Sequence, residues 1–318
     1  MKFNSKKIDI SKYIVYIIFV LCLIIFGIWL KGSFFSLSNL LNITRQAGAV
    51  SVMAIGMVFV IGLGHIDLSI GSVVAVSSLI TAYILRDTGN PVLAVIVAIG
   101  FGAIVGLFNG LCVTTIGMPA FLTTLGSQAI LTGIAMWISA TKAVPITHKG
   151  FLFWFGSGTI GQVPILLLLW AVGATVIGYI VLNNTSYGRK ILATGGNATS
   201  AKYSGVRVNK ITVLAFIYNG CLAAIAGTLY AGRAHSARWD FGSGVEMNVI
   251  AAVVLGGTAM SGGTGSVIGA LIGSFLIMMI DNGLVIGGLG VAQQTFMRGI
   301  IIILAVALSE IGRMKKRA

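Results

Sequence analysis

Three ionisable side chains lie within or at the edge of long hydrophobic runs: Asp67, Asp281 and Arg298. A charge in hydrocarbon costs free energy, so such side chains usually pair or serve a function. Asp67 directly precedes an apolar run, and we expect its carboxylate to cap the helix that begins there. Asp281 and Arg298 lie at similar depths in consecutive runs, which predicts an ion pair between them. The alternative is that each side chain extends separately to the lipid headgroups.

Patterns that would support catalysis or cofactor binding are nearly missing from the sequence. It contains no Gly-Lys-Ser or Gly-Lys-Thr, so we expect no nucleotide phosphate loop in this chain. Residues 156–161 match Gly-x-Gly-x-x-Gly, but no strand precedes them, and a chain with 43 glycines produces such matches by chance. His65, His148 and His235 are far apart and have no carboxylate at metal-ligand spacing. We therefore expect no enzyme activity, no bound cofactor and no metal site.

The composition excludes an ordinary soluble domain. Apolar residues make up 57% of the 318 residues and charged residues only 9%, with a mean hydropathy of +1.01. A soluble domain has about 25% charged residues, because its surface must face water. The net charge of +14 does not indicate nucleic-acid binding, because the basic residues sit between hydrophobic runs and form no basic face. The partner of most of this chain is membrane lipid.

A helix needs about 20 apolar residues to cross the hydrocarbon core of a membrane. Ten runs are candidates: 13–30, 46–63, 68–85, 92–113, 120–140, 164–183, 211–230, 247–260, 265–286 and 292–311. No cleavage site follows the first run, so we expect an uncleaved span. The eighth run is short and ends in glycines, which predicts a broken or re-entrant helix. The sequence thus predicts an all-α polytopic membrane protein with about ten transmembrane helices.

The distribution of basic residues orients these helices. When both termini are placed in the cytoplasm, thirteen Lys and Arg residues lie inside and seven outside, as the positive-inside rule requires. The acids Asp87, Asp240 and Glu246 then lie outside. The resulting map has a cytoplasmic N-terminal segment 1–12, a transmembrane domain 13–311 and a basic cytoplasmic tail 312–318.

Glycine spacing indicates close helix packing in two of the runs. The glycines that recur every fourth residue are Gly102, Gly106 and Gly110, and Gly265, Gly269 and Gly273. Rows of small residues let helix backbones approach closely in lipid, where no hydrophobic effect drives helix association. We expect both rows to lie at helix–helix contacts.

Five amide side chains fall in or next to the hydrophobic runs: Asn109, Gln128, Asn219, Asn248 and Asn282. They have two open interpretations. Each side chain can form a hydrogen bond between helices, or it can line a pathway for a polar, uncharged, hydroxyl-rich solute.

The segment 184–210 is the longest inside segment of the map, with five basic residues and no acidic one. A glycine pair before Asn197 predicts a turn, and residues 198–204 predict a short helix ended by Gly205. The segment is either a solvated loop that only fixes the topology, or a docking helix for a cytoplasmic partner.

Within this segment, Gly-Arg-x-x-x-Ala-x-Gly-Gly-Asn begins at Gly188. The pattern resembles the coupling loop of the permease subunits of bacterial sugar ABC importers of the ribose, xylose and galactoside type. Residues 54–72 resemble that family's junction between spans two and three, and residues 249–266 its glycine-rich eighth span. The resemblance runs in order from about residue 34 to 310.

This resemblance implies a role in ATPase coupling for one set of residues. They are Gly188, Arg189, Gly195, Gly196, Asn197, Ala201, Ser204 and Gly205. It also implies the partners: cytoplasmic ATP-binding subunits that hydrolyse ATP, a periplasmic or lipid-anchored substrate-binding protein, and a second permease copy, identical or paralogous. The expected location is the inner membrane, and the expected substrate is a monosaccharide or similar small polyol.

Departures from the family pattern at His65, Asn248 and Asp281 leave the particular sugar open. Two alternatives also remain. One is a permease of the same superfamily for nucleosides or branched-chain amino acids. The other is an ion-coupled secondary transporter, although the sequence has few of the intramembrane ionisable residues that such carriers use.

Overall fold

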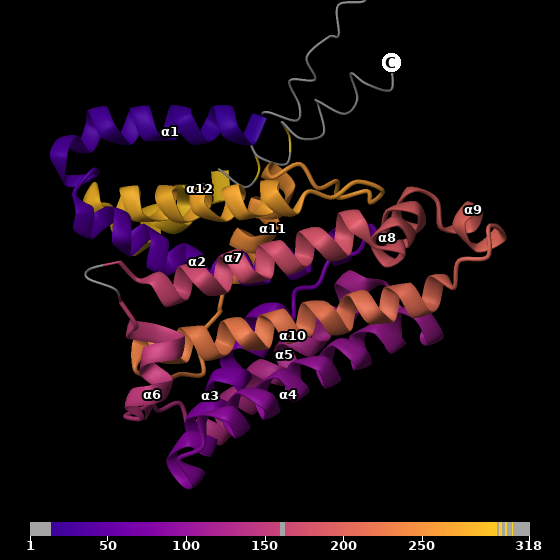
Figure 1. Cartoon of the computed structure of the whole chain (residues 1–318), viewed down its shortest axis with the longest axis horizontal. Coiled ribbons are helices and arrows are strands. Elements are labelled where there is room, and N and C mark those ends of the chain that lie inside the picture. Colours follow the sequence, from indigo (N-terminus) through magenta and orange to yellow (C-terminus); the bar gives the residue numbers. More distant parts are fainter. Residues whose placement is uncertain (1–13, 160–162, 298, 301–302, 304–306, 308–318) are drawn as a thin grey trace, which may run out of the picture.

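The structure is a computed structural model that describes residues 14–159, 163–297, 299–300, 303 and 307. Eight helices of the described residues are long and apolar enough to cross a membrane. They are α1 (Ile14–Leu30), α2 (Leu37–Gly62), α3 (Ile70–Thr88), α4 (Pro91–Leu111), α5 (Ala120–Ser139), α7 (Ile165–Tyr179), α10 (Val208–Ala234) and α12 (Val267–Ile286). They form one bundle (Figure 1), which confirms the predicted all-α polytopic membrane fold.

Short elements connect these helices. They are η2 (Lys31–Ser33), η3 (Cys112–Ile116), α6 (Lys149–Leu152), η4 (Phe153–Ser157), η5 (Ile180–Asn184), α8 (Ser186–Gly196), α9 (Ala198–Tyr203) and α11 (Val245–Leu255). Strands β1 (Val144–Pro145) and β2 (Ser236–Ala237) form a two-stranded antiparallel sheet, in which Val144 pairs with Ala237. In Figure 1, α8 and α9 lie at one end of the bundle and α6 at the other.

Three exposed tryptophans lie at the end of the bundle that holds α6. Trp29 at the end of α1, Trp137 at the end of α5 and Trp154 beside α6 are all at least 49% exposed. Tryptophan concentrates where a membrane meets water. These residues therefore mark the membrane interface at the α6 end.

The helix α10 forms the centre of the bundle and packs against α2, α3 and α4. The predicted glycine row of α4 faces it: a Cβ on Gly106 would collide with the carbonyl oxygen of Phe216, and one on Gly102 with that of Gly220. In the second row, Gly273 lies equally close to the carbonyl of Ala252 in α11. The α4 row and Gly273 therefore lie at helix–helix contacts, as the spacing predicts, whereas Gly265 lies in the loop before α12.

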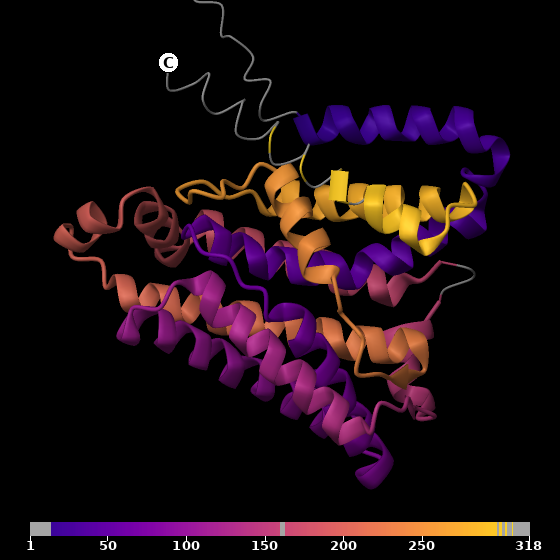
Figure 2. The ribbon, with the colours of Figure 1, turned by 180° about the vertical axis from the view of Figure 1, so that it is seen from behind.

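The eighth predicted run contains the short helix α11. Its 11 residues extend about 16 Å at 1.5 Å per residue, roughly half of a hydrocarbon core of about 30 Å. Figure 2 shows α11 in the interior of the bundle, followed by a loop that leads to the end with α8 and α9. A broken helix is therefore present in this run. Half of the tenth run, 292–311, lies outside the described residues, and so do the predicted cytoplasmic segments 1–12 and 312–318.

A second break separates α2 from α3. Figure 2 shows that residues 63–69 run from the α8–α9 end back into the bundle, where α3 begins. The starts of α3 and α11 meet there, because a Cβ on Gly71 would collide with the carbonyl oxygen of Gly242. Irregular backbone at membrane depth is tolerated where protein surrounds it. Two helices, α3 and α11, thus begin next to each other inside the bundle, and we call them the interrupted helices.

The second predicted span begins much earlier than its hydropathy indicates. The helix α2 starts at Leu37, nine residues before the predicted start of the run 46–63. The hydroxyl of Ser36 accepts a hydrogen bond from the backbone N–H of Asn39 and caps the helix. The first turns of α2 are polar, so a hydropathy window misses them.

Candidate functional site

The predicted coupling segment folds into two helices, α8 and α9, joined at Asn197. The side chain of Asn197 accepts a hydrogen bond of 2.9 Å from the N–H of Ser200 and begins α9. Gly205 ends it with a φ of +82°, a conformation that favours glycine. The helix ends at Tyr203, one residue before the predicted end. Local capping residues therefore determine this part of the site.

One face of the two helices packs on the bundle. Ile191 is fully buried and Ala201 is 5% exposed. The hydroxyl of Tyr187 donates a 3.4 Å hydrogen bond to the carbonyl of Ile211, and burial raises the pKa of this phenol. The opposite face exposes Arg189 and Lys190 to solvent. The segment is thus fixed to the bundle and has a free basic surface.

Glycines allow α8 to lie against the bundle backbone. A Cβ on Gly188 would collide with the carbonyl of Leu182, and one on Gly195 with the carbonyl of Gly62. Gly263 donates its backbone N–H to that same Gly62 carbonyl at 3.0 Å. By contrast, a Cβ on Gly196 would have its nearest neighbour at 3.9 Å. Gly188 and Gly195 therefore serve packing, whereas Gly196 faces open space.

The same contacts connect α8 with both interrupted helices. Gly62 is the last residue of α2, directly before the break that leads to α3. Gly263 lies in the loop between α11 and α12. A displacement of α8 would therefore act on both broken segments through their backbones.

Asp67 occupies a buried position in the first break, with 1% of its surface exposed. Its Oδ1 accepts hydrogen bonds from the backbone N–H of Ser69 at 2.9 Å and from its hydroxyl at 2.6 Å. Its Oδ2 accepts one from Asn219 of α10 at 2.9 Å. Because α3 begins at Ile70 with Ser69 as its N-cap, Asp67 does not cap the helix itself as predicted. It binds Ser69 just before the helix and Asn219 of α10.

Ser69 extends this network to two further helices. Its hydroxyl accepts a 2.9 Å hydrogen bond from Asn109 of α4, whose Oδ1 accepts one from Ser127 of α5 at 2.5 Å. Thr124 of α5 accepts a hydrogen bond from the N–H of Leu68 at 3.1 Å. The break between α2 and α3 is therefore bonded to α4, α5 and α10.

Of the other predicted pathway residues, Gln128 and Asn248 each donate a hydrogen bond to a carboxylate, and some amide oxygens have no partner in the part of the chain that the structure describes. Gln128 donates to Oε1 of Glu246 at 2.9 Å, and Asn248 donates to Oδ2 of Asp281 at 3.2 Å. Several buried acceptor oxygens have no hydrogen-bond partner among the described residues: Asn219 Oδ1, Glu246 Oε2, Asn248 Oδ1 and Asn282 Oδ1. Such oxygens can accept hydrogen bonds from hydroxyl groups.

The position of Glu246 differs from the one that the topology map predicts. The map places Glu246 outside with Asp87 and Asp240, but the side chain is only 5% exposed and lies in the first turn of α11. The chain enters the bundle before α11, so this acid lies beside the start of α3 and next to Gly71. The predicted partner of Asp281, Arg298, lies outside the described residues.

Sequence reasoning missed Ser69, Thr124, Ser127 and Glu246 as members of these networks. Serine and threonine are common in membrane helices, where they also bond to their own helix backbone. Their partners are chosen by the tertiary arrangement, which no local pattern encodes. Among the described residues, no three His, Cys, Asp or Glu side chains come together as metal ligands would.

Broken helices and buried polar contacts inside a membrane bundle are typical of multi-pass membrane transport proteins. Residues 39–306 match the family model described as branched-chain amino acid transport system, permease component. The chain belongs to this permease family, and it is a multi-pass protein of the inner membrane.

Characterised relatives cover most of the chain. The ribose import permease protein of Escherichia coli K12 is 36% identical over 283 residues, 87% of each chain. That of Bacillus subtilis 168 is 37% identical over 282 residues, 88% of this chain and 87% of the relative. The galactose/methyl galactoside import permease protein of Escherichia coli K12 is 32% identical over 95% of each chain. No solved structure matches the chain.

Proposed function

We propose that this chain is the transmembrane permease subunit of an ATP-driven importer that moves a monosaccharide or similar small polyol across the inner membrane. The observation that carries the proposal is the segment 184–210, which has the coupling-loop pattern and presents an exposed basic surface. The similarity to ribose and galactose import permeases over most of the chain supports the sugar class.

The driving force comes from a separate cytoplasmic ATP-binding subunit. This chain has no phosphate-loop motif of its own. The subunit docks on α8 and α9, and its nucleotide state moves α8. Because α8 touches Gly62 and Gly263, that movement reaches both interrupted helices and shifts the bundle between two states.

The solute passes polar side chains near the starts of α3 and α11. Asn109 and Asn219 already serve the Asp67 network, so their first role is to hold this region together. The side-chain oxygens of Gln128, Asn248, Asn282 and Glu246 accept hydrogen bonds from the hydroxyl groups of the solute. A second permease copy, identical or paralogous, and a substrate-binding protein at the α6 end complete the importer.

Reconstitution tests this proposal. The chain is co-expressed with an ATP-binding subunit and a substrate-binding protein from the same organism, and the complex is placed in proteoliposomes. We expect uptake of labelled ribose or galactose that requires ATP and the binding protein. Leucine or nucleoside uptake would contradict the sugar class, whereas uptake driven by an ion gradient without ATP would contradict the importer.

A further inference from the structure

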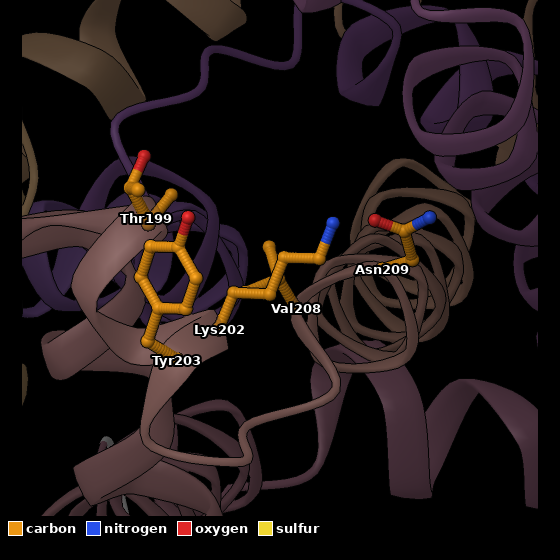
Figure 3. Close-up of a pocket in the computed structure, with 6 residues that line it drawn as sticks. Thr199, Lys202, Tyr203, Val208 and Asn209 are labelled. Atoms are coloured by element: carbon orange, nitrogen blue, oxygen red, sulfur yellow. The ribbon is translucent and has the colours of Figure 1, made fainter.

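A hollow of about 320 Å³ lies beside α9 at the basic surface (Figure 3). Its lining residues are Ala198, Thr199, Lys202, Tyr203, Val208 and Asn209. The first four belong to α9 and the last two to the first turn of α10. The hollow is therefore bounded by two helices that meet at an angle around the turn at Gly205.

The walls of the hollow are fixed by hydrogen bonds. Asn209 donates its side-chain N–H to the carbonyl of Thr114 in η3 at 3.3 Å. At the turn between the helices, Gly205 donates its N–H to the carbonyl of Lys202 at 3.0 Å, and Val206 donates to that of Ala201. The backbone on both sides of the hollow is thus held in place by hydrogen bonds.

The hollow combines positive charge with an apolar lining. Lys202 has no carboxylate within ion-pair distance among the described residues. The N-terminus of α10, a helix of 27 residues, adds the positive end of its dipole. Ala198 and Val208 supply apolar surface. This combination suits a side chain with an apolar stem and a negative end.

Tyr203 stands at the rim and is 89% exposed. The exposed ring adds a large flat contact surface beside the charge of Lys202. Tyrosine is enriched at the centres of protein–protein contacts, where it contributes much of the binding energy. Its position indicates a protein occupant for the hollow, because an isolated anion would not use the ring.

We infer that this hollow receives an acidic side chain of the ATP-binding subunit, with the carboxylate at Lys202 and the partner surface packed on Tyr203. The inference rests on the proposed function and adds the charge and the contact point of the docking surface. Charge complementarity supports it, since the segment 184–210 has five basic residues and no acid.

Charge reversal at two lysines of the same loop tests the inference. Lys202→Glu changes the hollow, whereas Lys190→Glu is the matched control on the exposed face of α8. Binding of the ATP-binding subunit to the full chain in nanodiscs of neutral lipid is measured as Kd at low and high salt. We expect Lys202→Glu to weaken binding roughly tenfold or more and to reduce the salt dependence. Lys190→Glu changes the same basic surface outside the hollow, so it should weaken binding at least about threefold less than Lys202→Glu does.

A second measurement does not depend on the variant's folding. A photo-crosslinking phenylalanine derivative, which keeps an aromatic ring, replaces Tyr203 in the otherwise unchanged chain, and the cross-linked peptide of the subunit is sequenced. An Asp or Glu within the cross-linked segment is expected, and a segment without acids would overturn the inference. Equal Kd values for the two lysine variants would also overturn it.

Two further outcomes separate the possible failures. If Lys202→Glu weakens binding only when the nanodiscs contain anionic lipid, the hollow serves a headgroup and the inference is wrong. If the unchanged chain binds no ATP-binding subunit under any condition, the proposed function itself fails. Binding by the unchanged chain that Lys202→Glu leaves intact overturns this inference alone.

Discussion

The side-chain amide of Asn219 in α10 donates a 2.9 Å hydrogen bond to Oδ2 of Asp67, which lies in the break between α2 and α3. Both side chains are almost completely buried. This bond joins the central helix of the bundle to the start of an interrupted helix. It therefore fixes the position of the break relative to the bundle.

Removing the amide should destabilise the protein. Asn219→Ala leaves Oδ2 of Asp67 buried without its partner, which costs about 1–3 kcal/mol or more for a charged group. We expect a lower melting temperature of the purified chain in detergent. Asn183→Ala, at an exposed asparagine, is the control and should melt like the unchanged chain. Equal melting of all three proteins would show that the bond does not stabilise the bundle.

The glycine row of α4 offers a matched pair of substitutions. Gly106→Ala places a methyl group against the carbonyl of Phe216 in α10, whereas Gly100→Ala on the same helix meets no atom within 4 Å. Overpacking typically costs about 1–3 kcal/mol. We expect reduced expression and a lower melting temperature for Gly106→Ala, and neither effect for Gly100→Ala. A tolerated Gly106→Ala would mean that α4 and α10 can separate at little cost.

The membrane orientation can be measured by cysteine labelling. Lys149 in α6 and Lys202 in α9 are both exposed and lie at opposite ends of the bundle. In a chain without its three native cysteines, Lys149→Cys should react with an impermeant maleimide in intact cells and Lys202→Cys should not. After the membrane is permeabilised, both should react. The reverse labelling in intact cells would invert the topology.

The pairing of Asp281 with Arg298 stays a prediction. A double-mutant cycle tests it with Asp281→Asn, Arg298→Gln and the double variant. Each single change should lower the melting temperature, and the double variant should recover part of the loss, because paired charges show a coupling energy of about 0.5–3 kcal/mol. Asp281 also accepts a hydrogen bond from Asn248, so Asn248→Ala serves as a reference for that contact. Strictly additive effects would exclude the ion pair.

Hydropathy and local capping predict much of this fold. The apolar runs locate the long helices, because lipid forces the backbone to satisfy its hydrogen bonds within each span. Likewise Asn197 and Gly205 predict α9 nearly to the residue, since a cap and a left-handed turn act over a few positions. The structure of the loop that holds the site could therefore be predicted from the sequence.

The contacts inside the bundle were harder to predict from the sequence. The map places Glu246 outside the membrane, one residue before the eighth run. The shortness of that run predicts a broken helix, but no local signal shows that the helix begins inside the bundle with Glu246 in its first turn. The partners of Asp67 are distant in sequence, and Asn219 follows it by 152 residues. Such contacts depend on how helices pack, which residue spacing within one run does not determine.

The central claim is that the segment 184–210 couples ATP hydrolysis to transport. Gly196→Trp tests it most directly, since a Cβ there has its nearest neighbour at 3.9 Å and Gly196 is exposed, so the ring should extend from α8 without unfolding the bundle. Gly100→Trp, in open space on α4, controls for the addition of a tryptophan. The measurement is substrate-stimulated ATPase activity, together with uptake, of the reconstituted importer. We expect Gly196→Trp to insert normally in the membrane but to lose substrate-stimulated hydrolysis and uptake, while Gly100→Trp keeps both. Normal stimulation and uptake in Gly196→Trp would contradict the claim.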